Sequence, residues 1–340
     1  MPPPPDGNEG GGRVKRNLQA GRLRGGGLSL NVFTSDELDE VHLATLEVLE
    51  RTGVFVEDEE ALEILHGAGA SIDAARKIAR IPGHIVEAAV DAAPPYFVAC
   101  GRIPDRDYLM ADGRVGFTNF GEGIALVDTY TGELREPTKQ DVGDSARMVD
   151  ALEDIDVYER ALGAHDVPQE VAALHNAHAI LQNTTKHAFI GPLNGFLCKK
   201  MIRLAAAIVG GVDKLRERPI VSTLTCPVSP LKLVRECCEI IIESARSGVC
   251  CNILSMAMAG GSSPVTLAGT LVTHNAEVLA GITLSQATAK GAPVVYGSST
   301  TAMDLRLAAA SVGSPELALI SAAVVQMARR YLLPSWVAGA

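Results

Sequence analysis

The stretch CNILSMAMAGGSSPVTLAGTLVTHNAEVLAGITLSQATAKGAPVVYG, residues 251–297, holds the pattern that decides the fold. Its two ends, 251–257 and 292–297, are short apolar runs typical of buried strands. Between them, residues 267–290 carry apolar side chains at helical spacing. A strand, a helix and a second strand in this order indicate a parallel βαβ unit.

The same alternation extends outward on both sides. Further strands are expected at 115–120, 156–160, 187–192, 219–225 and 333–338, and further helices at 138–152, 168–183, 196–209, 230–246 and 314–331. Such repetition favours a (β/α)8 barrel or a doubly wound sheet. Polar or Gly-rich turns follow several strands, and barrel enzymes place their sites at those ends, so we expect the barrel. Only seven strands are found, so the barrel is expected to be incomplete at its C-terminus.

The chain divides by composition into three parts. Residues 1–28 mix Pro, Gly and basic residues and are expected to form a disordered tail. Residues 29–110 form an N-terminal, mainly helical cap, in which Thr34 and Glu37 have capping-box spacing. Residues 111–340 form the barrel, truncated before its last strands.

Charge and hydropathy exclude several classes of protein. Acidic residues outnumber basic ones 40 to 30, which argues against nucleic-acid binding. No apolar run is long enough to span a membrane, so no membrane partner is expected. The seven cysteines include adjacent pairs, which suit free buried thiols and a cytoplasmic location better than a disulfide framework.

The densest polar cluster lies between Ser255 and Glu277. Gly260 to Ser263 either form a plain strand-to-helix turn or present N–H groups to an anion. His274 and Glu277 are three residues apart, so they could pair on one helix face, with Asn275 beside them; a structural histidine is the alternative. Motifs for dinucleotides, P-loop nucleotides and nucleophile elbows are absent.

Carboxylates and aromatic rings offer recognition of a cation. Glu122 lies in a Gly-flanked turn, and Glu316 lies near a helix start, where dipole stabilisation alone explains it. Phe120, Tyr296 and Trp336 lie at or near strand ends, as cation-binding rings or as core fillers. His175 and His178 lack a third ligand, so no metal site is expected.

The sequence resembles the trimethylamine methyltransferase family, whose members pass methyl groups from methylamines or quaternary amines to a corrinoid protein. The resemblance is carried by residues 254–281, by YGSSTT (296–301), by VGSPELALISAA (312–323) and by PSWVAGA (334–340). Weaker similarity covers nearly everything after residue 28. It implies a (β/α)8 barrel, a cytoplasmic enzyme of methylotrophic or methanogenic metabolism, and a corrinoid (cobalamin) carried by a partner. This chain lacks the D-x-H-x-x-G signature of corrinoid-binding modules, so it is expected to bind no cofactor itself.

Methyl transfer from an amine requires a cationic nitrogen, because a neutral amine is a poor leaving group. We therefore expect the site to hold a small methylated ammonium and to exclude water. The expected catalytic residues are Glu316, Glu122 and His274. The expected substrate-binding residues are Phe120, Tyr296, Ser298, Trp336, Met256, Asn275 and Glu277.

In trimethylamine-specific archaeal members, the strand that resembles PSWVAGA is followed by pyrrolysine. The resemblance therefore places pyrrolysine at or just after Ala340. Three alternatives stay open: a trimethylamine enzyme, a glycine betaine (quaternary amine) enzyme without pyrrolysine, and an inactive truncated barrel that only docks a corrinoid protein. A homo-oligomer is expected. Outside this family, the alternative function is a lyase or aldolase that forms an imine with its substrate through Lys186.

Overall fold

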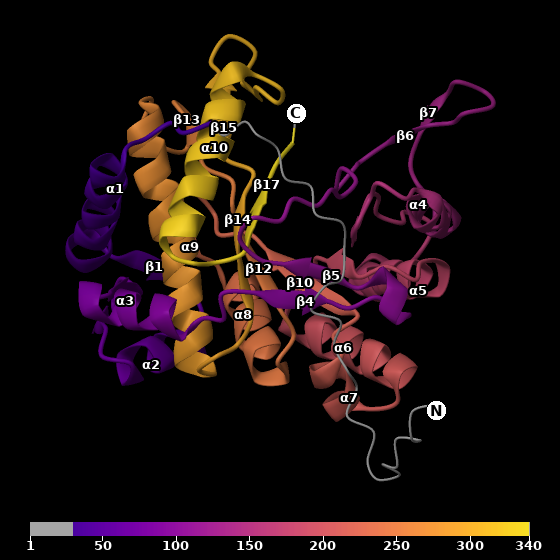
Figure 1. Ribbon diagram of the computed structural model, residues 1–340, viewed down its shortest axis with the longest axis horizontal. Coiled ribbons are helices and arrows are strands. Elements are labelled where there is room, and N and C mark those ends of the chain that lie inside the picture. Colours follow the sequence, from indigo (N-terminus) through magenta and orange to yellow (C-terminus); the bar gives the residue numbers. More distant parts are fainter. Residues whose placement is uncertain (1–29, 340) are drawn as a thin grey trace, which may run out of the picture.

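The computed structural model describes residues 30–339, and its centre is a parallel sheet of six strands. The strand order is β17-β14-β12-β10-β9-β8, and every neighbouring pair is parallel. Neighbours in the sheet are also neighbours in chain order among these six strands, as successive β-then-α units require. Figure 1 shows the helices on the outer side of this curved wall, with α9 and α10 beside β14 and β17.

The predicted βα units are confirmed, with shorter strands. The strands are β8 (Tyr158–Glu159), β9 (Ala188–Ile190), β10 (Val221–Thr225), β12 (Cys251–Ser255), β14 (Val294–Ser298) and β17 (Ser335–Val337). The helices between and before them are α4 (Lys139–Ala151), α5 (Ala172–Asn183), α6 (Gly195–Val209), α7 (Val212–Glu217), α8 (Arg235–Ser247), α9 (Leu267–Thr288) and α10 (Pro315–Arg330). A 3₁₀ turn, Gln169–Val171, precedes α5.

Two predicted elements are wrong in detail. The strand expected at 115–120 is reduced to one parallel bridge between Thr118 and Val157. Next to it, the Asn119 side chain occupies the hydrogen-bonding groups of Glu159, accepting from its N–H and donating to its carbonyl. The helix expected from residue 230 begins at Arg235, because Lys232–Leu233 (β11) pairs with β1 instead.

The N-terminal region combines three helices with short strands. These are α1 (Ser35–Glu47), a π-helical turn (Val48–Thr52), β1 (Val54–Val56), α2 (Glu59–Gly67), β2 (Ser71–Asp73), β3 (Ile78–Arg80) and α3 (Gly83–Ala92). The predicted capping box is present, since Thr34 and Glu37 cap each other's backbone N–H groups. The strands form the sheet β11-β1-β3-β2, and α1, α2 and α3 pack against α9. The expected tail, 1–28, lies outside the described residues, and the division into three parts stays a prediction.

A hairpin closes the amino-terminal end of the curved sheet. It consists of β4 (Phe97–Ala99) and β5 (Tyr108–Met110), joined by a loop that contains the 3₁₀ turn Pro104–Arg106. Its side chains pack with Val157, Phe189, Cys250 and Val295 in a small core inside the sheet. Arg218 anchors the hairpin through a bidentate ion pair with the buried Asp107 carboxylate, at 2.5 and 2.7 Å.

The curvature of the sheet is fixed by one contact across it. Phe189 on β9 and Trp336 on β17 have ring centroids 4.6 Å apart, although three strands lie between them. In a flat sheet, four strand spacings would separate them by about 19 Å. Extending the printed registers from Phe189 across the sheet leads to position 332, which precedes β17, so Trp336 lies four residues further along over four strand steps. An offset of one residue per strand is the shear of a (β/α)8 barrel.

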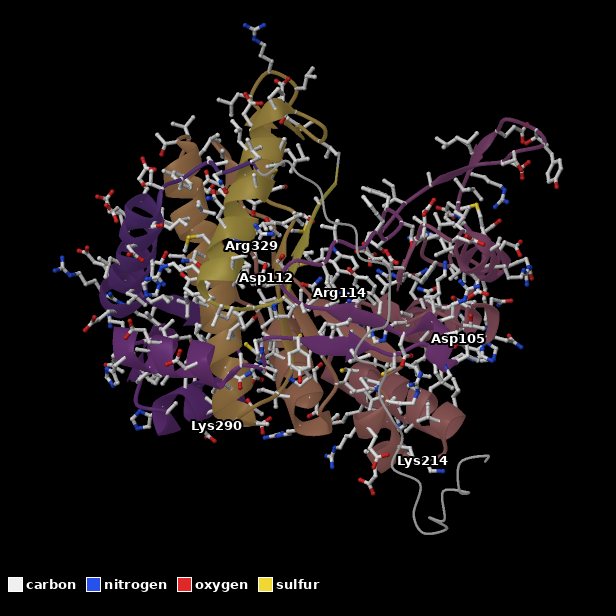
Figure 2. The ribbon with its side chains drawn as sticks, viewed as in Figure 1. Asp105, Asp112, Arg114, Lys214, Lys290 and Arg329 are labelled. Atoms are coloured by element: carbon white, nitrogen blue, oxygen red, sulfur yellow. The ribbon has the colours of Figure 1, made fainter. Side chains whose placement is uncertain are left out.

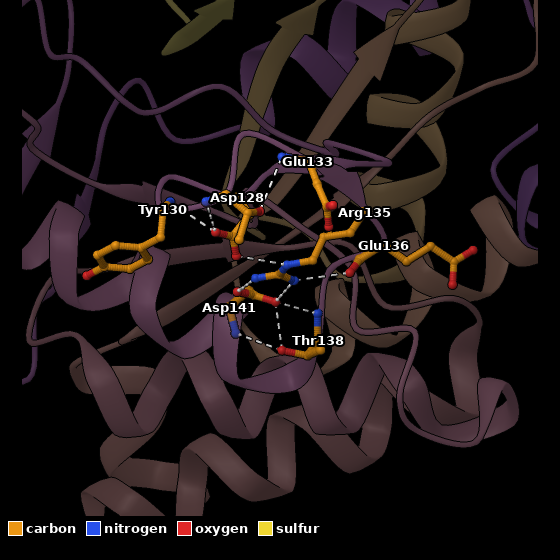
Figure 3. Close-up of polar contacts among 8 residues, drawn as sticks. Asp128, Tyr130, Glu133, Arg135, Glu136, Thr138 and Asp141 are labelled. Carbon is orange, nitrogen blue, oxygen red and sulfur yellow. Dashed lines mark hydrogen bonds and ion pairs between the residues drawn. The ribbon is translucent and has the colours of Figure 1, made fainter.

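A second hairpin stands away from the body, as Figure 1 shows. It consists of β6 (Leu126–Val127) and β7 (Leu134–Arg135). Arg135 holds its base, because its guanidinium binds both oxygens of Asp141 at 2.7 and 2.8 Å and also binds Asp128 (Figure 3). These bonds keep the pKa of the Asp141 carboxyl well below its usual range.

Three short strands form a small sheet beyond the ends of β12 and β14. They are β13 (Met258–Ala259), β15 (Thr301–Asp304) and β16 (Ala309–Ala310).

Candidate functional site

Alternation along the six strands separates side chains that face inside the curve from those that face the helices. Val157, Phe189, Cys250 and Val295 belong to the inner core with Trp336, whereas Tyr158, Ile190, Ile253 and Tyr296 belong to the outer core. Because side chains alternate along a strand, every second residue from these inner ones toward the carboxyl end of its strand also faces inward. Among them are Glu159, Gly191, Leu224, Cys226, Asn252, Leu254 and Gly297.

Two carboxylates meet at the carboxyl end of β8. Glu159 faces inward, and a Cβ on Gly121 would lie 2.5 Å from its Oε1. Glu122 is the residue after Gly121, and its backbone is in a left-handed conformation with φ of 64°. The Arg160 guanidinium donates to both Glu122 oxygens, with Nε 3.0 Å from Oε1. Glu122 therefore has its own cation, whereas Glu159 has no such partner in the described part of the chain.

The charges around Glu159 and Glu122, which we call the acidic corner, favour the binding of a cation. Burial and, to a smaller extent, the nearby Glu122 charge raise the pKa of Glu159 to about 7, against the opposing effect of Arg160. Burial and the same two carboxylates raise the pKa of the half-buried Cys226 thiol to about 12. A cation that displaces water beside Glu159 would stabilise its ionised form.

The end of β9, next to the two carboxylates, has no large side chain. A Cβ on Gly191 would find no atom closer than 3.6 Å, and one of its nearest neighbours would be Glu122 Oε1. Each strand is shifted by one residue relative to its neighbour, so inward side chains from different strands form levels along the axis of the curved sheet. Phe189, Asn252 and Trp336 lie at one level. Glu159, Leu224 and Gly297 lie one residue nearer the carboxyl ends of the strands. Two aromatic rings and an amide thus form a level directly below the carboxylate, an arrangement suited to a methylated cation.

Several predicted site residues lie behind the wall instead, between the sheet and the helices. Tyr296 donates to Asn275 at 2.7 Å, and Asn275 donates to Tyr331 at 2.8 Å and to Thr45 at 2.9 Å. His42 Nδ1 lies 2.9 Å from the same Tyr331 hydroxyl. This buried network joins α1 and α10 to β14.

His274 and Glu277 make no pair with each other. His274 Nδ1 lies 3.2 Å from Thr300 Oγ1, its ring packs edge-on against Tyr296, and burial lowers its pKa to about 3. Glu277 accepts from Ser255 at 2.6 Å, and from Ser229 Oγ and the N–H of Leu231, both at 2.9 Å. The buried Ser298 hydroxyl accepts from the N–H of Thr300. These groups brace the loops that follow the strands.

The remaining candidates lie on the surface. Met256 is 51% exposed at the end of β12, and Phe120 is 79% exposed beside Glu122. Glu316 is exposed in the first turn of α10, whose N-cap is Ser314. Other large apolar side chains are also exposed in the segments that follow the strands: Ile124, Leu193, Phe196, Val228, Val265, Leu305, Leu307 and Val312. The rim of the site is therefore apolar, whereas its interior is acidic.

Three features noted in the sequence make local contacts in the structure. The N–H groups of Gly261, Ser262 and Ser263 all bond to the Met258 carbonyl, so this segment is a closed turn and α9 begins at its Thr266 cap. The described residues contain no cluster of three potential metal ligands, and His175 instead approaches Lys139 at 3.1 Å. Lys186 donates to the carbonyls of Val149 and Leu152, just before β9 and away from the carboxyl ends of the strands.

A cavity of about 350 Å³ lies between β17 and the chain segment before β8. Trp336 lines it on one side, and residues 110–118 line the other. Figure 2 labels Asp112 and Arg329 at its edge, where Arg329 donates to Asp112 at 3.0 Å.

All seven cysteines are free thiols, as predicted. No helix between residues 30 and 339 has the length and apolarity needed to cross a bilayer.

Comparison with known proteins shows the family of this chain. Residues 9–340 match the family model described as trimethylamine methyltransferase (MTTB). The chain belongs to the trimethylamine methyltransferase family. It is 50% identical to the trimethylamine methyltransferase MttB of Desulfitobacterium hafniense DCB-2 over 96% of this chain and 66% of that protein, and 44% identical to MttB of Methanosarcina thermophila over 96% and 68%.

Further matches are a relative named for another substrate and a solved structure with a similar fold. The glycine betaine methyltransferase of D. hafniense Y51 is 32% identical over 90% of this chain and 63% of that protein. The crystal structure of Methanosarcina barkeri monomethylamine methyltransferase, MtmB, matches with a TM-score of 0.50 at 12% identity over 88% of this chain and 66% of that one; its hydroxylamine complex gives 0.52. The MtmB likeness supports the α/β fold alone. The chain spans about two thirds of the length of these relatives.

Two inward-facing polar residues of this family member were missed in the sequence. Glu159 lies in the predicted strand 156–160, and Asn252 lies in the strand 251–257. A polar residue inside an apolar strand was the available signal, since such residues are seldom buried without a reason.

Proposed function

We propose that this chain is part of a methyltransferase that takes a methyl group from trimethylammonium and passes it to the Co(I) of a corrinoid carried by a separate protein. The observation that carries the proposal is Glu159, an inward carboxylate that pairs with no cation among residues 30–339, above the Phe189 and Trp336 rings. The names of the relatives add trimethylamine as the substrate class.

The acidic corner would hold the ammonium and keep its nitrogen cationic. Glu159 supplies the negative charge that Arg160 does not neutralise by pairing with Glu122, and the two rings offer faces to the N-methyl groups. A cationic nitrogen leaves as a neutral amine when its methyl group is displaced, whereas a neutral one would leave as an amide anion. The residues therefore lower the barrier by binding the reactive form and orienting one methyl group outward.

The apolar rim supports a large acceptor. Corrinoid chemistry would supply a strongly nucleophilic metal, and the sequence lacks the D-x-H-x-x-G signature of corrinoid-binding modules. Exposed apolar side chains gathered in the loops that follow the strands are typical of a surface that another protein covers. We accordingly propose a corrinoid-bearing protein partner, a cytoplasmic location and assembly into a homo-oligomer.

Glycine betaine is the second candidate substrate, because one relative is named for it. Its carboxylate would require a cation near the site. Arg160 is already paired with Glu122, which favours the amine without a carboxylate.

Methyl transfer to free cob(I)alamin tests the proposal, with its absorbance spectrum followed after addition of trimethylamine, dimethylamine or glycine betaine. We expect methylation with trimethylamine and a loss of at least about tenfold in Glu159→Gln. Glu40→Gln, an exposed carboxylate on α1, is the matched control. No transfer from any amine, or a loss in Glu316→Gln rather than Glu159→Gln, would contradict the proposed site.

A further inference from the structure

Asn252 is a fully buried amide without a hydrogen bond. Its side chain is 0% exposed on β12, and neither Oδ1 nor Nδ2 has a partner among residues 30–339. It faces the inside of the curved sheet, because Cys250 two residues earlier belongs to the inner core and Ile253 next to it belongs to the outer core. Its register partners, Leu224 and Val295, are apolar.

Folding alone gives no reason for an amide at this position. An unpaired buried donor or acceptor costs about 1 to 3 kcal/mol, and leucine has the same branched shape without that cost. The neighbouring strand also makes room for it, since a Cβ on Gly297 would overlap Asn252 Oδ1. The structure therefore accommodates a polar group that it does not itself satisfy.

The surroundings limit what can satisfy it. The inward positions of the six strands carry no lysine or arginine, and the charged group nearest in level is Glu159, one residue above. An anionic ligand would meet this carboxylate without a counter-ion. A cation is attracted by the carboxylate, and a hydrogen-bond donor on that cation matches the free Oδ1.

We propose that Asn252 is a specificity residue whose Oδ1 accepts the N–H of a protonated tertiary amine. The inference rests on the proposed function and deepens it. Trimethylammonium has one N–H, whereas tetramethylammonium has the same charge and a similar apolar surface but no donor. A site built around a hydrogen bond discriminates strongly against a ligand that lacks the matching group.

Ligand-induced shifts of Tm separate the two cations. In the unaltered chain, trimethylammonium chloride raises Tm more than tetramethylammonium chloride at equal concentration. In Asn252→Leu the trimethylammonium affinity falls about tenfold or more, the tetramethylammonium response is unchanged, and the ligand-free Tm stays the same or rises. Ser285→Ala is the matched control, because Ser285 Oγ is also buried without a partner, but on the central helix α9. It should leave both responses unchanged.

Three results would overturn the inference: equal losses for both cations, a fall in the ligand-free Tm without a change in preference, or a matching loss in Ser285→Ala. Asn252→Ala serves if the leucine variant does not fold. Methyl transfer, measured separately, distinguishes the failures. Transfer that is indifferent to Asn252 removes only the specificity role, whereas selective binding without transfer removes only the proposed reaction.

Discussion

Phe189 and Trp336 contact each other at a ring separation of 4.6 Å although their strands are four steps apart in the sheet. This contact brings the last described strand back toward the second one and places an aromatic level beneath Glu159. The same pair therefore shapes the sheet and forms one side of the proposed amine site.

Trp336→Ala should lower the free energy of unfolding by about 2 to 4 kcal/mol, because it removes a large ring from a packed contact. Trp336→Phe should cost less, since it keeps an aromatic face against Phe189. Urea denaturation measures both. Tyr130→Ala is the control, because Tyr130 is 97% exposed at the tip of the second hairpin and should change stability by less than about 0.5 kcal/mol. Equal stability of Trp336→Ala and the parent chain would show that the ring contact does not hold the sheet.

Gly297→Ala should destabilise the chain by about 1 to 3 kcal/mol, because the added methyl overlaps Asn252 Oδ1. Asn252→Ala removes that oxygen, so the double variant should recover much of the loss. A double-mutant cycle in urea gives the coupling between the two sites. Additive effects would mean that the strain of Gly297→Ala comes from the neighbouring backbone, which also lies near the added methyl.

The buried ion pair between Asp107 and Arg218 should be sensitive to loss of one partner. The Asp107 carboxylate is 0% exposed, and Arg218→Met would leave it charged without its main counter-ion, at a cost of about 3 to 5 kcal/mol. Arg216→Met is a nearby comparison on α7, where the arginine is 52% exposed, and it should cost less than about 1 kcal/mol. Thermal unfolding of the two variants, followed by circular dichroism, compares them. Similar values would place the strength of the hairpin anchor in its apolar contacts instead.

The periodicity of the sequence predicts the repeated βα units well, because helical spacing and short apolar runs are local properties. It fails at residues 115–120, where the side chain of Asn119 replaces strand pairing with Glu159, a contact between residues 40 apart. Such long-range hydrogen bonds leave no periodic signal.

The site was harder to predict for a related reason. Tyr296 and His274 are candidates in the sequence because they lie near a strand end and in a polar cluster, but the alternation of β14 turns Tyr296 toward the helices. Which face of a strand lies inside depends on the curvature, and the curvature follows from contacts such as Phe189 with Trp336. Glu159 became a candidate only when its inward direction was known.

The elevated pKa of Glu159 makes a signed prediction about stability. Burial raises this pKa from 4.5 to about 7, so between these values the folded chain binds a proton that the unfolded chain releases. The contribution of Glu159 to the free energy of unfolding is therefore full below about pH 4.5 and is lost as pH rises toward 7. Glu159→Gln cannot ionise, so at pH 8 it should be more stable than the parent chain by up to about 3 kcal/mol, with little difference near pH 4.

Urea titrations at pH 4, 6 and 8 check this dependence, with Glu40→Gln as the exposed control that should follow the parent chain. Trimethylammonium adds a second arm to the measurement. Because a bound cation stabilises the ionised carboxylate, it should reduce the loss of stability between pH 6 and 8 in the parent chain and have no such effect in Glu159→Gln. Parallel pH profiles for the parent and Glu159→Gln would mean that Glu159 ionises normally and that the acidic corner does not favour a cation in the way proposed.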